Sequence, residues 1–406
     1  MTTLSTADLD PLLTALIQSA EGISDLLFVT GKPPLAETHG RLLPPVNLNL
    51  PILTSPQIES LAFAIINGNE RLVEDLAQTG SCDCSYSLTG ICRFRANIYR
   101  QNSNYAMVLR RLSSKIPTMA ELKLPPVFYD IIKEKTGLVF ITGGTGSGKT
   151  TTLAALLNEI NLTHEVHVVT LEDPIEFLHP QLKAAFSQRE LGRDFYNFPA
   201  GLRASLRQAP KIILVGEIRD RETMDIVLTA GETGHLVFST LHTMSAGQTI
   251  NRILGMFSRE EEQLVRERLA GSLRYIVSQR LIPKREGGRL LVTELLGSSL
   301  RSREAMQLGE GENRRFADII EAGSTLGWHS FEQSLSRAFE DELITEEAAV
   351  LYSINKSLMT QRVDVIKNRS MKMSGFSSLK MAEAPARPPA RPPRPPSPPS
   401  LPPEQV

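Results

Sequence analysis

Residues 137–150 read Gly137-Leu-Val-Phe-Ile-Thr142, then Gly143-Gly-Thr-Gly-Ser-Gly-Lys-Thr150. The first run is continuously apolar, the pattern of a strand buried on both faces of a parallel sheet. The second fits G-x-x-x-x-G-K-[ST], a loop whose glycines let successive backbone N–H groups point into one concavity. Apolar residues then recur at helical spacing up to Asn161, so a helix begins at the loop and directs its positive dipole end into it. The segment predicts an α/β domain that binds a nucleotide.

The candidate phosphate-binding residues form one continuous stretch. The Lys149 ammonium is placed to reach the β- and γ-phosphates, and the Thr150 hydroxyl to ligate Mg²⁺. ATP and Mg²⁺ are therefore the expected cofactors. The predicted nucleotide-binding residues are Gly143, Gly144, Thr145, Gly146, Ser147, Gly148, Lys149, Thr150 and Thr151.

Two further predicted strands, over residues 166–171 and 212–215, end in acidic residues. The second ends in Gly-Glu and resembles a Walker B strand, which brings a carboxylate beside the metal. Parallel strands open their carboxyl ends at the ligand-binding edge of an α/β sheet, so these acids are expected to face the phosphate loop. Any one of them alone could equally solvate a strand end. The candidates are Glu172, Asp173, Glu176 and Glu217.

His235 and His242 flank another predicted strand, Leu236-Val-Phe-Ser-Thr-Leu241. Their separation places them on opposite faces of an ideal strand. Spacing alone therefore favours a structural role and argues against a metal pair, while a contact from either histidine to a γ-phosphate stays open.

Residues 1–115 mix helix and strand signals and predict a small α+β domain. Helical spacing marks residues 9–18 and 58–78, and strand patterns mark residues 25–30 and 91–99. Tyr105 to Arg110 is the expected hairpin partner of the last strand.

Residues 116–355 alternate strands and helices, which predicts a parallel-sheet domain with a helical C-terminal part. Residues 356–406 are predicted to be a basic, disordered tail. The last 22 residues hold 11 of the 26 prolines, in Arg-Pro-Pro repeats that favour polyproline II over a packed core.

Charge is distributed unevenly along the 406 residues. Positions 1–355 carry 35 Lys/Arg against 42 Asp/Glu, whereas Lys356 to Arg394 carries nine against two. The acidic body argues against nucleic acid as a partner. The N-terminal residues lack the pattern of a secretory signal, and no window is apolar enough for a membrane span. Three closely spaced cysteines do not fit a paired zinc motif, so the cytosol is the expected compartment.

The motifs taken in order resemble those of the secretion ATPases of type II secretion and type IV pili. Within these the sequence is most similar to the PilT/PilU-like retraction ATPases of twitching motility, over residues 24–343. The resemblance rests on the phosphate loop and on Glu172-Asp-Pro-Ile-Glu176, Gln188-Arg-Glu190, Leu202-Arg-Ala-Ser-Leu-Arg-Gln208, Ile213-Leu-Val-Gly-Glu-Ile-Arg-Asp220 and Gly234-His-Leu-Val-Phe-Ser-Thr-Leu-His-Thr243.

The resemblance implies a PAS-like N-terminal domain and a RecA-like ATPase domain, assembled as a homohexamer with ATP between subunits. It implies that Glu217 is the Walker B glutamate, beside Mg²⁺ with Thr150, and that Glu176 orients the attacking water or acts as general base. His235 and His242 become the histidine-box pair. Arg95 and Arg110 match two N-terminal arginines that reach the nucleotide phosphates, here expected to act on a neighbouring subunit.

The function implied is an ATP-driven retraction motor at the cytoplasmic face of the inner membrane, with a membrane platform protein and a paralogous retraction ATPase as partners. Two segments depart from the family pattern. Ala209-Pro-Lys211 stands where the family has acid-Pro-acid, and Ser299 to Met306 keeps only fragments of an Ala-Ile-Arg-Asn-Leu-Ile-Arg-Glu-like segment. A PilU-like accessory ATPase of low turnover, a pilus assembly ATPase and a type II secretion ATPase stay open as alternatives.

Overall fold

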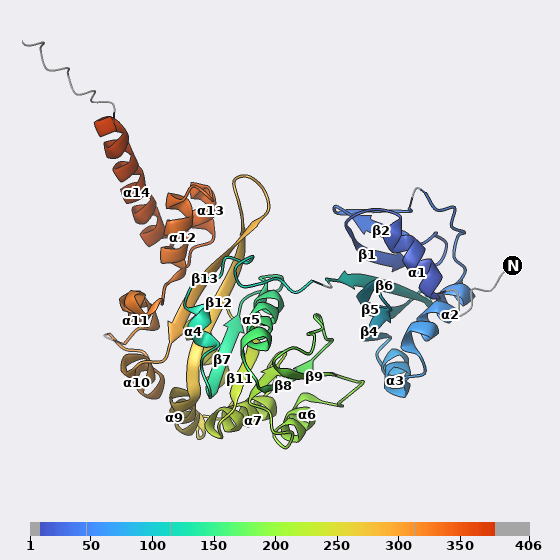
Figure 1. Ribbon diagram of the computed structural model, residues 1–406, viewed down its shortest axis with the longest axis horizontal. Coiled ribbons are helices and arrows are strands. Elements are labelled where there is room, and N and C mark those ends of the chain that lie inside the picture. Colours follow the sequence, from blue (N-terminus) through green and yellow to red (C-terminus); the bar gives the residue numbers. More distant parts are fainter. Residues whose placement is uncertain (1–8, 46, 114, 313, 378–406) are drawn as a thin grey trace, which may run out of the picture.

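The computed structural model describes residues 9–377 except positions 46, 114 and 313, as two domains joined by the segment after β6 (Figure 1). The N-terminal domain has an antiparallel six-stranded sheet in the order β3-β2-β1-β6-β5-β4. Its strands are β1 (Ile23–Phe28), β2 (Leu35–Thr38), β3 (Arg41–Leu43), β4 (Ser81–Leu88), β5 (Cys92–Gln101) and β6 (Asn104–Leu112). Its helices are α1 (Leu9–Gln18), α2 (Ser55–Ile66) and α3 (Glu70–Gln78).

Strand β5 has an apolar face and a polar face. Phe94, Ala96 and Ile98 are buried in the core, while Arg93 and Arg95 lie on the opposite face. This alternation is the period of two that the sequence shows, and the predicted hairpin with β6 is confirmed. The arginines therefore leave the N-terminal domain on the side away from its own core.

The prediction of one helix over residues 58–78 is wrong. The structure has two helices, because Asn67 and Gly68 both adopt positive φ, at 49° and 71°, which ends α2. Asn69 then caps α3, its side chain accepting a hydrogen bond from the Leu72 N–H at 3.3 Å. Asn67-Gly-Asn69 ends one helix and begins the next. The apolar spacing continues across these residues, so a prediction from spacing alone misses the break.

The ATPase domain is built on a seven-stranded sheet in the order β13-β12-β7-β11-β10-β8-β9. All neighbours pair in parallel except β12 and β13. Every residue of β7 and β11 is buried, as the continuous apolar runs require. The strands are β7 (Gly137–Thr142), β8 (His167–Glu172), β9 (Ala185–Glu190), β10 (Ile212–Val215), β11 (Leu236–Leu241), β12 (Leu273–Pro283) and β13 (Arg289–Gly297).

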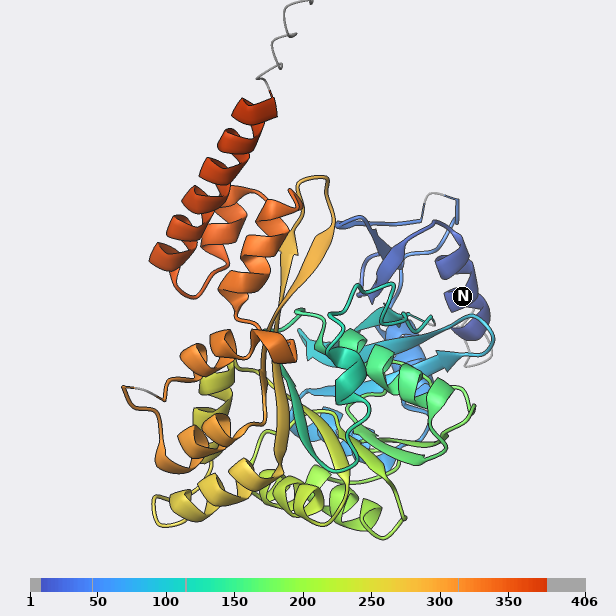
Figure 2. The ribbon, with the colours of Figure 1, turned by 60° about the vertical axis from the view of Figure 1, so that its left-hand side comes forward.

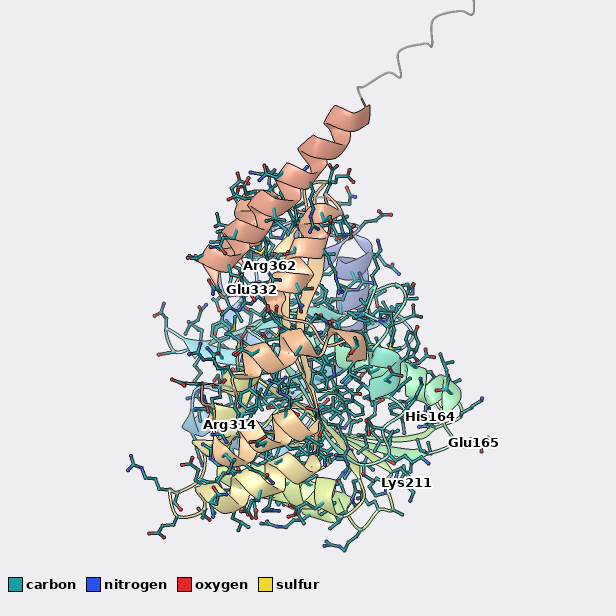
Figure 3. The ribbon with its side chains drawn as sticks, turned by 90° about the vertical axis from the view of Figure 1, so that its left-hand side faces the viewer. His164, Glu165, Lys211, Arg314, Glu332 and Arg362 are labelled. Atoms are coloured by element: carbon teal, nitrogen blue, oxygen red, sulfur yellow. The ribbon has the colours of Figure 1, made fainter. Side chains whose placement is uncertain are left out.

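Helices surround this sheet, and α7 contacts both β7 and β11. At the amino edge of the sheet, His164, Glu165 and Lys211 precede strands β8 and β10 (Figure 3). The helices of this part are α4 (Phe128–Ile131), α5 (Lys149–Thr163), α6 (Phe198–Ser205), α7 (Arg221–Glu232), α8 (Ala246–Leu254), α9 (Glu262–Ser272), α10 (Leu300–Leu308) and α11 (Phe316–Ala322), with a short 3₁₀ turn, η2 (Ser324–Leu326).

Helices α12 (Phe331–Glu340), α13 (Glu346–Leu351) and α14 (Lys356–Ser377) form a small separate core, from which α14 extends outward (Figure 2). Residues 356–377, the first part of the predicted tail, therefore form a helix that packs on α12 and α13. Met359 and Val363 of α14 are buried. Buried Glu332 accepts the backbone N–H groups of Ile354 and Asn355, both at 2.8 Å, which fixes the turn that enters α14.

The basic charge of residues 356–377 led to the prediction of a disordered tail. The same segment also carries a few apolar residues that pack into a core, and the charge pattern hides them. The Arg362 guanidinium donates to Glu321 at 2.8 Å, and Figure 3 shows Arg362 and Glu332 among these C-terminal helices. The Pro-rich part of the predicted tail, residues 378–406, lies outside the described residues. Among the helices that the structure describes, none is long and apolar enough to cross a membrane.

Candidate functional site

The phosphate loop curls between β7 and α5 because glycines stand at its tightest points. Gly143 has φ 146°, and a Cβ there would lie 2.5 Å from both the Gln279 carbonyl oxygen and Ser147 Oγ. Gly148, the residue before α5, has φ 89°. Only glycine adopts these conformations without strain, so the backbone amides of the loop are free to line one concavity.

The groups of the loop fit a triphosphate. Lys149 Nζ donates to the carbonyl oxygens of Gly143 and Gly144, at 2.9 and 3.0 Å. Burial lowers the pKa of Lys149, and the carboxylates of Glu217 and Glu176 act in the opposite direction. The Ser147 hydroxyl is buried and has no hydrogen-bond partner. A buried ammonium and an unpartnered hydroxyl are the donors that phosphate oxygens satisfy.

A cavity of about 410 Å³ lies over this loop, at the carboxyl edge of the sheet. Its volume lies within the usual range of small-molecule sites. It brings together the ends of β8, β10 and β11 and one strand of the N-terminal domain. The polar residues that line it are Arg95, Thr145, Lys149, Thr150, Glu172, Asp173, Glu176, His179, Glu217, Arg219, Thr240 and His242.

Glu217 lies at the centre of this lining. Its carboxylate is 18% exposed, pairs with the Arg219 guanidinium, and lies 3.6 Å from His242 Nε2. Mg²⁺ bound to a nucleotide keeps several waters and takes one or two protein oxygens. The Thr150 hydroxyl and the Glu217 carboxylate line the same cavity, so the two residues fit that requirement.

The acids of the segment after β8 differ in their surroundings. Burial raises the pKa of Glu172 to about 7, although its carboxylate accepts from the Thr170 hydroxyl at 2.7 Å and from the Gln188 amide. Burial also raises the pKa of Asp173, against the opposing charges of Arg219 and Arg95. Glu176 faces the cavity. Glu172 is thus buried, whereas Glu176 is the more accessible of the two acids in the cavity lining.

The structure separates the two histidines. His242 lines the cavity beside Glu217. His235 precedes the other end of β11, where its Nδ1 lies 3.2 Å from the Ala230 carbonyl oxygen. Because β11 spans the sheet between them, one chain cannot bring both to the same nucleotide. The contact of His235 with the Ala230 carbonyl oxygen fits the structural role that its spacing favours. His242 is the histidine available to a phosphate.

The two arginines are also separated, although they pair across β5 and β6. Arg95 lines the cavity of its own chain, and its guanidinium lies 3.8 Å from the Asp83 carboxylate. Arg110 is exposed and donates to Asp25 at 2.8 Å. In this structure Arg95 therefore lines the cavity of its own chain, whereas the resemblance implied action on a neighbouring subunit.

Sequence reasoning missed Arg219, which pairs with Glu217 and whose charge opposes the rise that burial causes in the pKa of Asp173. Its place two residues after Glu217 was the available signal. It also missed Phe198 and Phe177 in the lining. Nothing in local spacing marks these aromatics, because α6 and the segment after β8 meet only in the folded domain.

Comparison with known proteins gives the family. The family model described as Type II/IV secretion system protein matches residues 99–322. The chain is 40% identical over 329 residues to the type IV pilus retraction ATPase PilT of Pseudomonas aeruginosa, covering 81% of this chain and 94% of that protein. It is 35% identical over 334 residues to the type IV pilus ATPase PilU of the same organism, covering 82% and 86%.

A solved structure described as the pilus retraction motor PilT with bound ADP superposes with a TM-score of 0.78 at 34% identity. The match covers 87% of this chain and 99% of that one. The phosphate loop, the acids at the strand ends and the N-terminal antiparallel sheet lie within a fold shared over nearly the whole of that protein. The chain belongs to the type II/IV secretion system ATPase family, as a PilT/PilU-like member.

Proposed function

We propose that this protein is an ATP-hydrolysing, Mg²⁺-dependent hexameric motor that powers type IV pilus retraction and twitching motility. One observation carries the proposal: a single cavity joins the phosphate loop to Glu217, Glu176, His242 and Arg95. The similarity to PilT and PilU supports the choice of pilus retraction.

Each residue of the cavity has a role in hydrolysis by in-line attack of water. Loop amides and Lys149 hold the β- and γ-phosphates, and Thr150 and Glu217 hold Mg²⁺, which when bound neutralises charge on the phosphates. Glu176 orients the attacking water. Arg95 and His242 offer positive charge or a hydrogen bond to the γ-phosphate as its negative charge redistributes. Their positions at several strand ends let one nucleotide contact them together.

Force would arise from the two-domain construction. A nucleotide in the cavity touches the ATPase domain and, through Arg95, the N-terminal domain, so its binding and release would change how the two domains meet. In a homohexamer this motion would pass to an inner-membrane platform protein, with the ring at the cytoplasmic face. A paralogous retraction ATPase is a further partner, and the net negative charge of residues 1–355 argues against nucleic acid as one.

A second candidate is a PilU-like accessory ATPase of low turnover. The observation that favours it lies at α10 (Leu300–Leu308), where the sequence keeps only fragments of the Ala-Ile-Arg-Asn-Leu-Ile-Arg-Glu-like segment of the family. An assembly or type II secretion ATPase of the same family is the third candidate. The assembly ATPase differs from the retraction candidates in phenotype, because loss of an assembly ATPase removes surface pili whereas loss of a retraction ATPase accumulates them.

The test combines turnover with a count of pili. Purified wild-type protein is expected to hydrolyse ATP only with Mg²⁺, Lys149→Ala to lose turnover, and Lys133→Ala to keep it, since Lys133 is exposed and pairs only with Asp130. Deletion of the gene is expected to give excess pili without twitching. Turnover in pure Lys149→Ala protein would refute the motor, and bald cells would select the assembly alternative.

A further inference from the structure

Glu190, at the end of β9, contacts both domains. Glu190 is 5% exposed. One carboxylate oxygen accepts from the Ser85 hydroxyl of β4 at 2.7 Å, and the other lies 3.3 Å from the Arg93 guanidinium of β5. Both partners belong to the N-terminal domain, so a buried carboxylate of the ATPase domain is held by two donors from the other domain.

The same groups reach the segment that holds Glu176. The second oxygen of Glu190 also accepts the Ile175 N–H at 3.2 Å. Arg93 closes the cycle by donating to the Ile175 carbonyl oxygen at 2.9 Å. Ile175 therefore exchanges hydrogen bonds with both members of the ion pair, through its N–H and its C=O. Its neighbour Glu176 lines the nucleotide cavity.

Arg93 and Arg95 are two residues apart on one strand and lie on one face of the sheet. A contact that fixes the position of Arg93 therefore also fixes, through the strand backbone, the position from which the Arg95 side chain extends. The buried ion pair has one partner in each domain, so it forms only when the domains meet as they do here. An exposed pair would tolerate many arrangements, whereas a buried charge needs its partner.

We propose that Arg93, Glu190 and Ser85 form an interdomain latch that positions Arg95 over the nucleotide of its own chain while holding the Ile175–Glu176 segment. This proposal rests on the proposed function. The latch residues do not touch the nucleotide cavity, and they act as positioning residues. When the latch opens, Arg95 leaves the cavity with its strand, so hydrolysis is confined to the closed arrangement of the two domains.

The first measurement does not depend on turnover. In full-length assembled protein, Glu190→Ala and Arg93→Ala are expected to raise amide hydrogen exchange in the segment 173–178. Arg100→Ala is the matched control, because Arg100 lies on the same strand and its guanidinium contacts Tyr105 of the same sheet. Unchanged exchange in both latch variants would overturn the proposal, even if wild-type protein failed to hydrolyse ATP.

The second measurement asks through which residue the latch acts. Arg93→Ala is expected to lower kcat about 10²-fold, the scale of a 1 Å misplacement, with little change in ATP affinity. In an Arg95→Ala background the same change is expected to cost less than it does in the wild type, since the part of the loss that runs through Arg95 is already gone and only the hold on the Ile175–Glu176 segment remains. A full additional loss would show that Arg93 does not act through Arg95 and would overturn the positioning role.

Milder variants keep the test valid if the alanine variants fold poorly. Glu190→Gln keeps one acceptor oxygen, for either the Ile175 N–H or the Ser85 hydroxyl, but loses the ion pair, and Arg93→Lys keeps the charge but loses the planar fork. Both are expected to lower kcat less than Arg93→Ala, with exchange in segment 173–178 rising in proportion. A fall in kcat without a rise in exchange in these folded variants would contradict the latch.

Discussion

The phosphate loop and the N-terminal arginine face are built in different ways. The loop and its helix come from consecutive residues, and their spacing predicted β7 and the start of α5 at the residues observed. The arginine face reaches the same cavity from a separate sheet, through contacts between residues about 80 to 105 positions apart. The phosphate loop, built from consecutive residues, binds the nucleotide. The arginine face reaches the cavity only through contacts between the domains, so its position depends on how the two domains are placed.

Changing an acid of the locally placed ATPase site is expected to have the largest effect. Glu217→Gln should lower kcat about 10²–10³-fold with near-normal ATP binding, because it removes the carboxylate beside Mg²⁺ and not the phosphate donors. Glu176→Gln should behave similarly if Glu176 orients the water. Steady-state turnover with a separate binding titration checks both, and a wild-type rate in either variant removes that residue from its role.

The two arginines of the N-terminal face should differ strongly although they are cross-strand neighbours. Arg95→Ala should lower kcat about 10- to 10²-fold, whereas Arg110→Ala should change it less than about twofold, since Arg110 contributes an exposed ion pair. Rings mixed from wild-type and Arg95→Ala subunits separate the two modes of action. A rate that follows the wild-type fraction supports action on the chain's own nucleotide, and a steeper fall supports action on a neighbour's.

The pH dependence of stability should distinguish the buried Glu172 from the other acids that line the cavity. Its pKa of about 7 in the folded protein exceeds the ordinary 4.5, so the folded state binds the extra proton between these values. Stability must then fall as pH rises from about 5 to 7, by about 2–3 kcal/mol for this group. Glu172→Gln should flatten that slope in chemical denaturation, and Glu294, with its pKa also near 7, should retain its own share.

The smallest expected effect separates local from interdomain stabilisation at one residue. Asn69 caps α3 through Leu72 N–H, and its amide donates to the Gly192 carbonyl oxygen of the ATPase domain at 3.2 Å. Asn69→Ala should cost about 1 kcal/mol, while Asn69→Asp keeps the cap and loses only the donation to Gly192. Equal losses in both variants would place the whole effect in the interdomain bond.

Sequence patterns predicted what depends on neighbours along the chain. The strands β7 and β10 and the helix α1 begin and end where expected, and the hairpin of β5 and β6 was paired correctly. The break at Asn67-Gly68 was missed because apolar spacing continues across it. The helix α14 was missed because its net charge concealed the buried Met359 and Val363.

The site was predicted in the same uneven way. Four residues of the loop share one cavity with Glu217, Glu176 and His242, as strand ends at a common edge require; the four are Thr145, Gly146, Lys149 and Thr150. The place of His235 at the other end of β11 follows from the sequence, in which the two histidines flank that strand, whereas the resemblance treats them as a pair. The place of Arg110 could not be derived, because a motif names residues and does not say what each one contacts. Glu190 belongs to a motif of the resemblance and Arg93 to a predicted strand, but neither signals the other, because their contact forms only where the domains touch.

The resting place of Lys149 has a consequence for a machine that must cycle. Its ammonium lies against two carbonyl oxygens of its own loop. Phosphate oxygens that contact Lys149 must therefore compete with partners that the protein itself supplies. Nucleotide binding then exchanges one set of hydrogen bonds of Lys149 for another, with a small net gain in free energy. Such a small gain favours rapid release of the product over tight binding.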